Sequence, residues 1–175
     1  MTTANAVARY NAVARALHWI IAILIIVNLA LGLAHESLPK AWNVMTWHKS
    51  FGLSVLILTV IRILWRFTYK MPPWPATMPQ SQVVIAKLTH LALYFLMLAM
   101  PITGWIFSSA GKYPIALFGI PWPKLAVTKD MAITGISHEG HEILGFIAIA
   151  LIVLHIAAAI YHHRVVKDDI LKRMM

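Results

Sequence analysis

The sequence predicts an all-α integral membrane protein, folded as a bundle of four transmembrane helices. Three observations predict it. The chain is 60% hydrophobic and only 12% charged, with a mean hydropathy of +0.73, whereas soluble domains are about one quarter charged. Four apolar runs are each about as long as a helix needs to cross a bilayer, and the basic residues gather in the connections between them. One bundle uses the whole length, so residues 1–175 are expected to form a single domain.

The first two spans are predicted at about 17–34 and 48–66. Basic residues precede the first run and small residues end it, so a signal peptide is the alternative interpretation. This run is longer than the apolar segment of a usual signal peptide, however, and it opens with His18 and Trp19, which a cleaved segment would not need. We therefore interpret it as a true span, joined to the second span by a short connection at 35–46.

The third and fourth spans are predicted at about 87–108 and 139–163. A proline-rich segment at 68–82 precedes the third span, and it is predicted to be a loop because proline cannot continue a helix interior. The longest connection, 109–137, is amphiphilic and rich in proline and aromatic residues, so it is expected to lie on the membrane surface. A polar tail follows the fourth span.

The distribution of basic residues predicts the orientation of the bundle. Four spans place both termini on one side of the membrane. Ten basic residues lie on that side: Arg9, Arg15, Arg62, Arg66, Lys70, Lys87, Arg164, Lys167, Lys172 and Arg173. Five lie on the other: Lys40, Lys49, Lys112, Lys124 and Lys129. Cytoplasmic connections carry the excess of Lys and Arg, so both termini are predicted to be cytoplasmic.

Composition also excludes several functions. The sequence has no cysteine, which excludes disulfides, thiolate-held iron–sulfur clusters and covalently attached c-type haem. Any haem would be non-covalent, with histidine as its axial ligand. The net charge of +9 does not indicate nucleic-acid binding, because the basic residues flank apolar spans in small groups.

Histidines within the fourth span indicate a functional site. An ionisable side chain inside a membrane is costly and suggests function. His141 and His155 are 14 residues apart, which places them within roughly 40° on one helix face and about 21 Å apart along the axis. That spacing suits a helix that ligates two metal centres stacked across a membrane.

Topology supplies a partner for each of these histidines. His18 opens span one near the inner surface, at the depth of His155. His48 opens span two near the outer surface, at the depth of His141. A porphyrin iron needs two axial ligands on opposite faces, and facing helices of a bundle supply them. The predicted haem-ligand pairs are therefore His18 with His155 and His48 with His141.

Two glycines support the outer pair. Gly52 and Gly145 each lie four residues after a predicted ligand, on the same helix face, where a missing side chain would let a flat macrocycle approach the backbone. Ordinary helix packing is the alternative explanation.

The other histidines have weaker assignments. His162 keeps the face of His155, about 10 Å nearer the cytoplasm, where it could bond a quinone carbonyl or a haem propionate. His90 opens span three and could meet a propionate or simply pack. His35, His138 and His163 are expected at the interface or in solvent.

No other catalytic motif is present. In HEGHE, His138 and His141 are three residues apart, so the segment does not fit the H-E-x-x-H zinc motif. The sequence also lacks a phosphate-binding loop, a G-x-S-x-G elbow and a dinucleotide fingerprint. Electrons would therefore have to be exchanged with something other than NAD bound to this chain.

The ordered set of histidine motifs resembles the bacterial cytochrome b561 family, and the resemblance covers almost the whole chain. The fragments that carry it are LHW at 17–19, WHKSFG at 47–52, HE-x-x-G at 141–145, LH at 154–155, HH at 162–163 and KDDILKRMM at 167–175. Within that family the chain is most similar to the small superoxide oxidases of the bacterial inner membrane. It resembles more loosely the cytochrome b subunits of nickel hydrogenases and formate dehydrogenases.

This resemblance implies a multi-pass inner-membrane protein with two haem b groups, which oxidises superoxide at the periplasmic face and reduces ubiquinone. The family's haem ligands fall on His18, His48, His141 and His155, the residues that depth and helical phase select. Its quinone-side histidine falls on His162.

These observations lead to a hypothesis with two alternatives. Electrons would enter at the outer haem, pass to the inner haem and reach ubiquinone near His162. Lysines on the outer side, Lys49 above all, would steer the superoxide anion, with Lys112, Lys124 and Lys129 as further candidates. Arg15 and Arg62 or Arg66 could pair with inner propionates. The alternatives are an electron relay that serves a partner redox protein, and a non-redox carrier of divalent metal ions that uses the same histidines.

Overall fold

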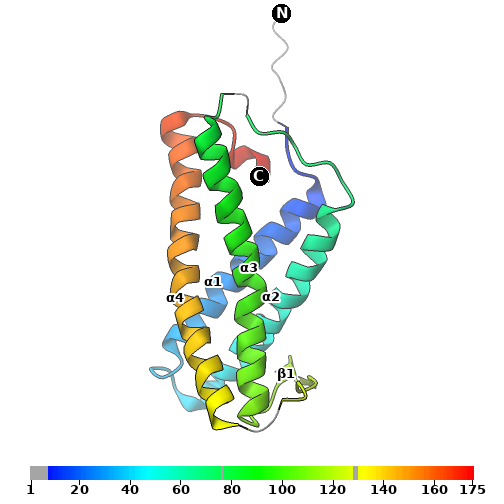
Figure 1. The fold of residues 1–175 in the computed structure, drawn as a ribbon, viewed down its shortest axis with the longest axis vertical. Helices are drawn as coiled ribbons and strands as arrows, with labels where there is room; N and C mark the ends of the chain where they lie inside the picture. Colours follow the sequence, from blue (N-terminus) through cyan, green and yellow to red (C-terminus); the bar gives the residue numbers. More distant parts are fainter. Residues whose placement is uncertain (1–7, 76, 128–129) are drawn as a thin grey trace, which may run out of the picture.

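A computed structural model describes residues 8–75, 77–127 and 130–175. Four long helices form the fold (Figure 1): α1 (Ala12–Ala34), α2 (Val44–Arg66), α3 (Gln80–Ala110) and α4 (Met131–Tyr161). Each is long and apolar enough to span a membrane; the second span takes in the short helix η1 (Lys40–Trp42), and the fourth extends through η2 (His162–Val166). The prediction of a four-helix membrane bundle is therefore confirmed.

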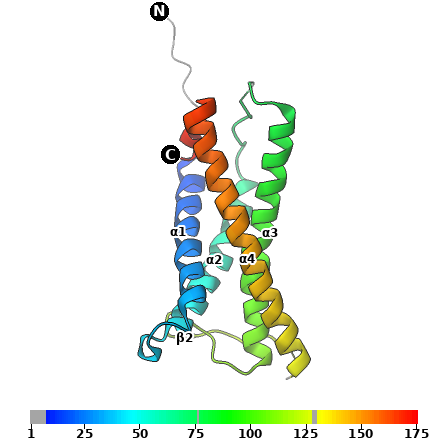
Figure 2. The same cartoon turned by 90° about the vertical axis from the view of Figure 1, so that its left-hand side faces the viewer.

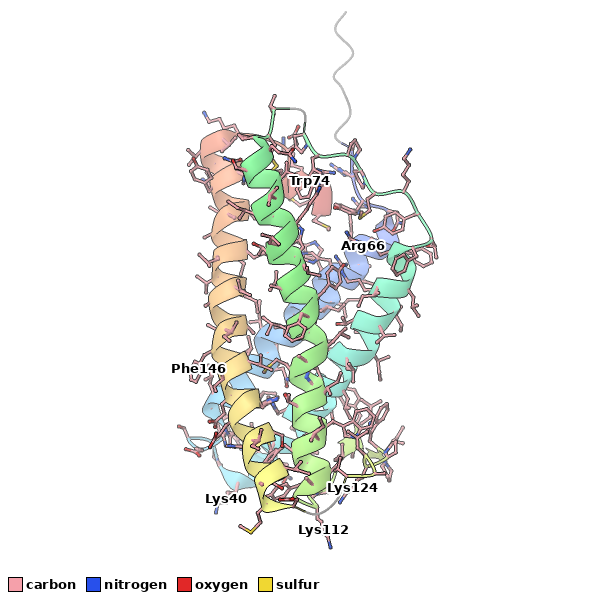
Figure 3. All side chains as sticks on the ribbon, in the orientation of Figure 1. Lys40, Arg66, Trp74, Lys112, Lys124 and Phe146 are labelled. Atoms are coloured by element: carbon pink, nitrogen blue, oxygen red, sulfur yellow. The ribbon has the colours of Figure 1, made fainter. Side chains whose placement is uncertain are left out.

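The helices pack as two pairs, each made of two helices that are consecutive in the sequence. α1 packs mainly against α2, and α3 mainly against α4, with α2 and α3 joining the pairs. Figure 2 shows the two pairs side by side, with α1 and α4 facing the viewer. Many large apolar side chains are exposed and lie away from the interior of the bundle, among them Ile23, Leu64, Leu91 and Val153. Figure 3 shows the side chain of Phe146 on α4. Outward apolar faces are what a bundle surrounded by lipid requires.

All four helices begin earlier than the sequence predicts, α3 and α4 by the most. α3 starts at Gln80, directly after Pro79, and α4 starts at Met131, where the Asp130 side chain accepts a hydrogen bond from the Ala132 amide at 2.6 Å. Hydropathy marks only the part of a helix that lies in hydrocarbon, whereas capping residues set where the helix begins. The long connection therefore occupies 111–130 rather than 109–137.

This connection contains a small β-hairpin that the sequence did not predict. Strands β1 (Ala116–Leu117) and β2 (Ile120–Pro121) pair antiparallel. Phe118 and Gly119 link them, and both have positive φ, at 50° and 89°, as a type I′ turn requires. The Ser50 hydroxyl of α2 donates to the Ala116 carbonyl and accepts from the Phe118 amide, each at 3.1 Å. The hairpin is thereby fixed against α2.

The tail after α4 folds back toward the start of α1 (Figure 1). Its last helix, η3 (Leu171–Met174), follows η2 after a short turn. The Tyr10 amide donates to the Arg173 carbonyl at 3.1 Å, and the Trp19 indole donates to the Met174 carbonyl at 2.7 Å. We call this end of the bundle the terminal side and the opposite end the hairpin side.

Candidate functional site

A cavity of about 1050 Å³ runs between the two helix pairs. Its walls come from all four helices and are mostly apolar. At the terminal side it reaches Trp74, Arg62 and Arg173, and at the hairpin side it reaches Lys49 and Glu142. All four predicted ligand histidines line it.

The structure brings these four histidines together in the predicted pairs. His18 of α1 and His155 of α4 form the terminal-side pair, with ring centroids 6.3 Å apart and ring planes at 77°. His48 of α2 and His141 of α4 form the hairpin-side pair, with centroids 6.0 Å apart and planes at 79°. His141 and His155 both lie on α4, whereas His18 lies on α1 and His48 on α2. Each pair therefore joins α4 to a different helix.

The separation within each pair fits one metal ion between two imidazoles. A metal–imidazole bond is about 2 Å long and the ring nitrogen lies about 1.1 Å from the ring centre, so coaxial ligation places the two centroids roughly 6 Å apart. Both observed separations match that distance.

Hydrogen bonds at Nδ1 fix the tautomer of both histidines in the hairpin-side pair. The Nδ1 atom of His48 lies 3.0 Å from the Asn28 carbonyl, and that of His141 lies 2.9 Å from the Met100 carbonyl. A carbonyl can only accept, so both histidines carry hydrogen on Nδ1, and Nε2 holds the free lone pair. A hydrogen bond from the other ring nitrogen to a carbonyl oxygen orients a metal-ligating histidine.

Two glycines make room for these rings. A Cβ atom on Gly32 would lie 3.0 Å from Cε1 of His48, and one on Gly104 would lie 3.1 Å from Cε1 of His141. Each glycine comes four residues after the residue whose carbonyl accepts from the same histidine, Asn28 or Met100. α1 and α3 therefore present the same unit, a carbonyl one turn before a glycine, to α2 and α4.

Sequence reasoning missed Gly32 and Gly104 and selected Gly52 and Gly145. A Cβ on Gly52 would lie 3.4 Å from Nδ2 of Asn28, and one on Gly145 would lie 3.6 Å from Cε of Met100. Both are ordinary contacts, and both glycines line the cavity. Their lack of side chains leaves space beside the ligands. The paired spacing of a glycine four residues after Asn28 and after Met100 was the signal that could have identified the other two.

The terminal-side pair has different surroundings. Within the described parts of the chain, neither His18 nor His155 has a hydrogen-bond partner. His90 of α3 lies beside His155, with centroids 5.6 Å apart, and stacks on Trp74 at 6.3 Å and 17°. Arg62 also lines this end and is held by the Ala14 carbonyl at 2.7 Å.

The remaining predicted residues are more scattered. His162 is buried, and its Nδ1 atom lies 2.6 Å from the Asp168 carboxylate; it is not among the residues that line the cavity. Arg66 lines the terminal side of the cavity, whereas Arg15 bonds the Met175 main-chain oxygen and does not line it.

Basic residues gather at the hairpin side as well. Lys49 lines the cavity there, donates to the Pro114 carbonyl at 2.9 Å and lies over the Tyr113 ring at 5.5 Å. Figure 3 shows Lys112 and Lys124 at this same end, opposite Trp74 and Arg66. Lys129 lies outside the described residues.

A carrier site for divalent metals finds no support here. Within residues 8–75, 77–127 and 130–175, no group of three or more His, Asp or Glu side chains could hold a metal ion. The histidines instead form two separate pairs, and a pair leaves the other coordination positions of a metal to a planar ligand such as a porphyrin.

Four membrane-spanning helices enclose an apolar cavity across which histidines meet in two pairs, so the fold and the site define a multi-pass membrane protein with a histidine-lined cavity. The chain belongs to the prokaryotic cytochrome b561 family, whose family model matches residues 9–175. Members of this family are b-type haem proteins, so the chain is a membrane cytochrome with an electron-transfer or oxidoreductase role.

Curated relatives support the same family. The chain is 35% identical to "Cytochrome b561 homolog 2" of Escherichia coli (strain K12), over 100% of this chain and 95% of that protein. It is 33% identical to "Probable superoxide oxidase CybB" of Yersinia pestis, over 95% of this chain and 96% of that protein. It is 30% identical to "Cytochrome b562" of Cereibacter sphaeroides, over 91% and 90% respectively.

Proposed function

We propose that this protein is a superoxide oxidase, a single-domain di-haem b cytochrome of the bacterial inner membrane that passes electrons from superoxide to ubiquinone. The observation that carries the proposal is the pair of imidazole couples, 6.0 and 6.3 Å apart at the centroids, at opposite ends of one cavity. When bound, two haem groups supply one-electron carriers stacked across the membrane. The relative named as a probable superoxide oxidase supports the choice of substrate.

The protein's own residues set the direction of the reaction. Lys49 and the lysines around it provide positive charge on the hairpin side, the proposed periplasmic face, where it would attract a small anion. Two superoxide anions give up one electron each and leave as O₂. Two electrons and two protons then convert ubiquinone to ubiquinol at the terminal side, the proposed cytoplasmic face.

Charges along the cavity favour this direction. At the terminal side, Arg62, Arg66 and Arg173 line it. At the hairpin side, the charged residues that line it are Lys49 and Glu142, and the Glu142 carboxylate lies 3.7 Å from Nε2 of His138. Excess positive charge stabilises a reduced centre, and Nδ1 bonds to carbonyls make the hairpin-side imidazoles stronger donors to the oxidised metal. With haem bound at both pairs, both effects would raise the potential of the terminal-side centre relative to the hairpin-side centre.

The quinone contact is proposed at the terminal side, near η2. His162 is a candidate through its Nε2 atom, because Nδ1 is occupied by Asp168. His162 is buried and does not line the cavity, so a quinone would have to displace neighbouring side chains to reach it.

The test is a purified preparation in detergent. It should contain two haem b groups per chain by pyridine haemochrome assay, and it should form ubiquinol from superoxide faster than the uncatalysed reaction. Absence of b-type absorption bands would exclude the haem proposal. Bound haem without quinol formation would instead favour an electron relay that receives its electrons from a partner redox protein.

A further inference from the structure

The tail of the chain carries a buried arginine into the terminal end of the cavity. Arg173 lies in η3 and is 6% exposed. Its Nη2 atom donates to the Pro72 and Pro73 carbonyls, each at 2.8 Å, and its guanidinium lies over the rings of Tyr10 and Trp74 at 5.7 and 5.9 Å. The side chain thus joins the tail, the proline-rich loop and the segment before α1.

The charge of Arg173 is not balanced by any of these neighbours. In the described part of the chain, no carboxylate lies within ion-pair distance of it: Asp169 pairs with Lys172 at 2.9 Å, and Asp168 bonds His162. The Nε atom of Arg173 is fully buried and has no hydrogen-bond acceptor. A buried charge without a counter-charge is costly, and a guanidinium with a free N–H beside a cavity is suited to bind a carboxylate.

The surroundings connect this arginine to the terminal-side histidine pair. Trp74 contacts Arg173 and also stacks on His90, and His90 lies beside His155. Arg173 and His90 both line the cavity that holds His18 and His155. A planar ligand held by that pair and bearing carboxylate arms could reach the guanidinium without leaving the cavity.

We propose that Arg173 binds a propionate carboxylate of the haem held by His18 and His155, and that the tail thereby becomes part of the haem pocket. This inference rests on the proposed function, since it requires haem at that pair. The tail is already held in place by the Trp19 and Tyr10 hydrogen bonds to its main chain. The carboxylate supplies the missing counter-charge, so haem binding and docking of η3 stabilise one another.

The experiment compares two adjacent cations with two forms of haem. Arg173→Gln removes the buried cation, and Lys172→Gln removes a half-exposed one that is paired with Asp169. Each full-length variant is loaded with haem b or with its dimethyl ester, in which the carboxylates are blocked, and the rate of haem loss to an apoglobin acceptor is measured. We expect Arg173→Gln to release one of the two haems about tenfold faster, because one charge-assisted hydrogen bond is lost. The acceleration should be seen only with haem b, whose carboxylates are free, and not with the ester. Lys172→Gln should match the wild type.

Several outcomes would overturn the proposal. Equal acceleration of loss for haem and its ester would show that Arg173 only packs the tail. An effect that is independent of esterification but disappears without anionic phospholipid would assign the site to a lipid phosphate. If Arg173→Gln folds poorly, Arg173→Lys keeps the charge and should show the same dependence on free carboxylates at a smaller magnitude; no dependence would count against the proposal. A wild type that binds no haem would instead refute the proposed function.

Discussion

Replacement of Gly104 by alanine tests the site geometry most directly. The new methyl group would lie 3.1 Å from Cε1 and 3.3 Å from Nδ1 of His141. Ordinary contact begins at about 3.4 Å, so the ring has to move by a few tenths of an ångström. The Met100 carbonyl belongs to the same helix turn as the glycine and cannot retreat independently. The movement must therefore lengthen the Nδ1 hydrogen bond or tilt Nε2 away from the metal.

The expected loss follows from the value of that hydrogen bond. Loss of the hydrogen bond that orients a metal-ligating histidine lowers metal affinity about 10- to 100-fold. This corresponds to about 1.4 to 2.7 kcal/mol of binding free energy. Gly104→Ala should therefore lose the hairpin-side haem preferentially and keep the terminal-side haem. The measurements are haem content per chain and a potentiometric titration, in which one of two redox steps should shrink or shift.

The matched control is Gly140→Ala, one residue before His141. A Cβ on Gly140 would meet nothing within 4 Å, so haem content should not change and the helix should gain about 0.5–1 kcal/mol of stability. If Gly104→Ala retains both haems at unchanged potentials, or if both variants lose haem equally, the assignment of Gly104 as the wall behind the ligand is wrong.

Three further predictions concern the histidine pairs and their surroundings. His155→Ala should abolish the terminal-side haem and leave about half the total; unchanged haem content would contradict the pairing. Ring planes at 77° and 79° predict a highly anisotropic low-spin ferric EPR signal for both haems, whereas an ordinary rhombic spectrum, typical of parallel planes, would mean that haem binding rotates the rings. Lys49→Gln should lower the rate with superoxide several-fold at low salt and less at high salt, because screening weakens steering; a loss that is independent of ionic strength would assign Lys49 a structural role.

Helical phase and topology were enough to predict which histidines meet. His141 and His155 share a face because 14 residues nearly complete four turns, and alternating entry of the spans fixes the depths of His18 and His48. The pairing needed no knowledge of side-chain contacts.

The features that sequence reasoning missed depend on contacts between helices. Gly32 and Gly104 belong to the site only because each faces a histidine of the neighbouring helix. The rotation of one helix relative to another cannot be predicted from the sequence of either helix alone. The hairpin was missed for a local reason. Its turn places Phe118 at positive φ, where Asn or Gly is usual, and the strands are only two residues long. Ser50 and the aromatic rings of Trp47 and Phe51 hold that turn in place.

In the proposed assignment one ligand of each pair, His141 or His155, lies on α4, and this has a consequence for electron transfer. Movement of α1 or of α2 would shift the histidine of only one pair. The two histidines on α4, in contrast, are joined by an uninterrupted helix from Met131 to Tyr161. The helix rise therefore fixes the distance between the two proposed ligands on α4 at about 21 Å along the axis, and movement of α1 or α2 does not change it. A single residue inserted between His141 and His155 would turn one ligand by about 100°, so we expect this segment to tolerate substitution on its lipid face but no change in length.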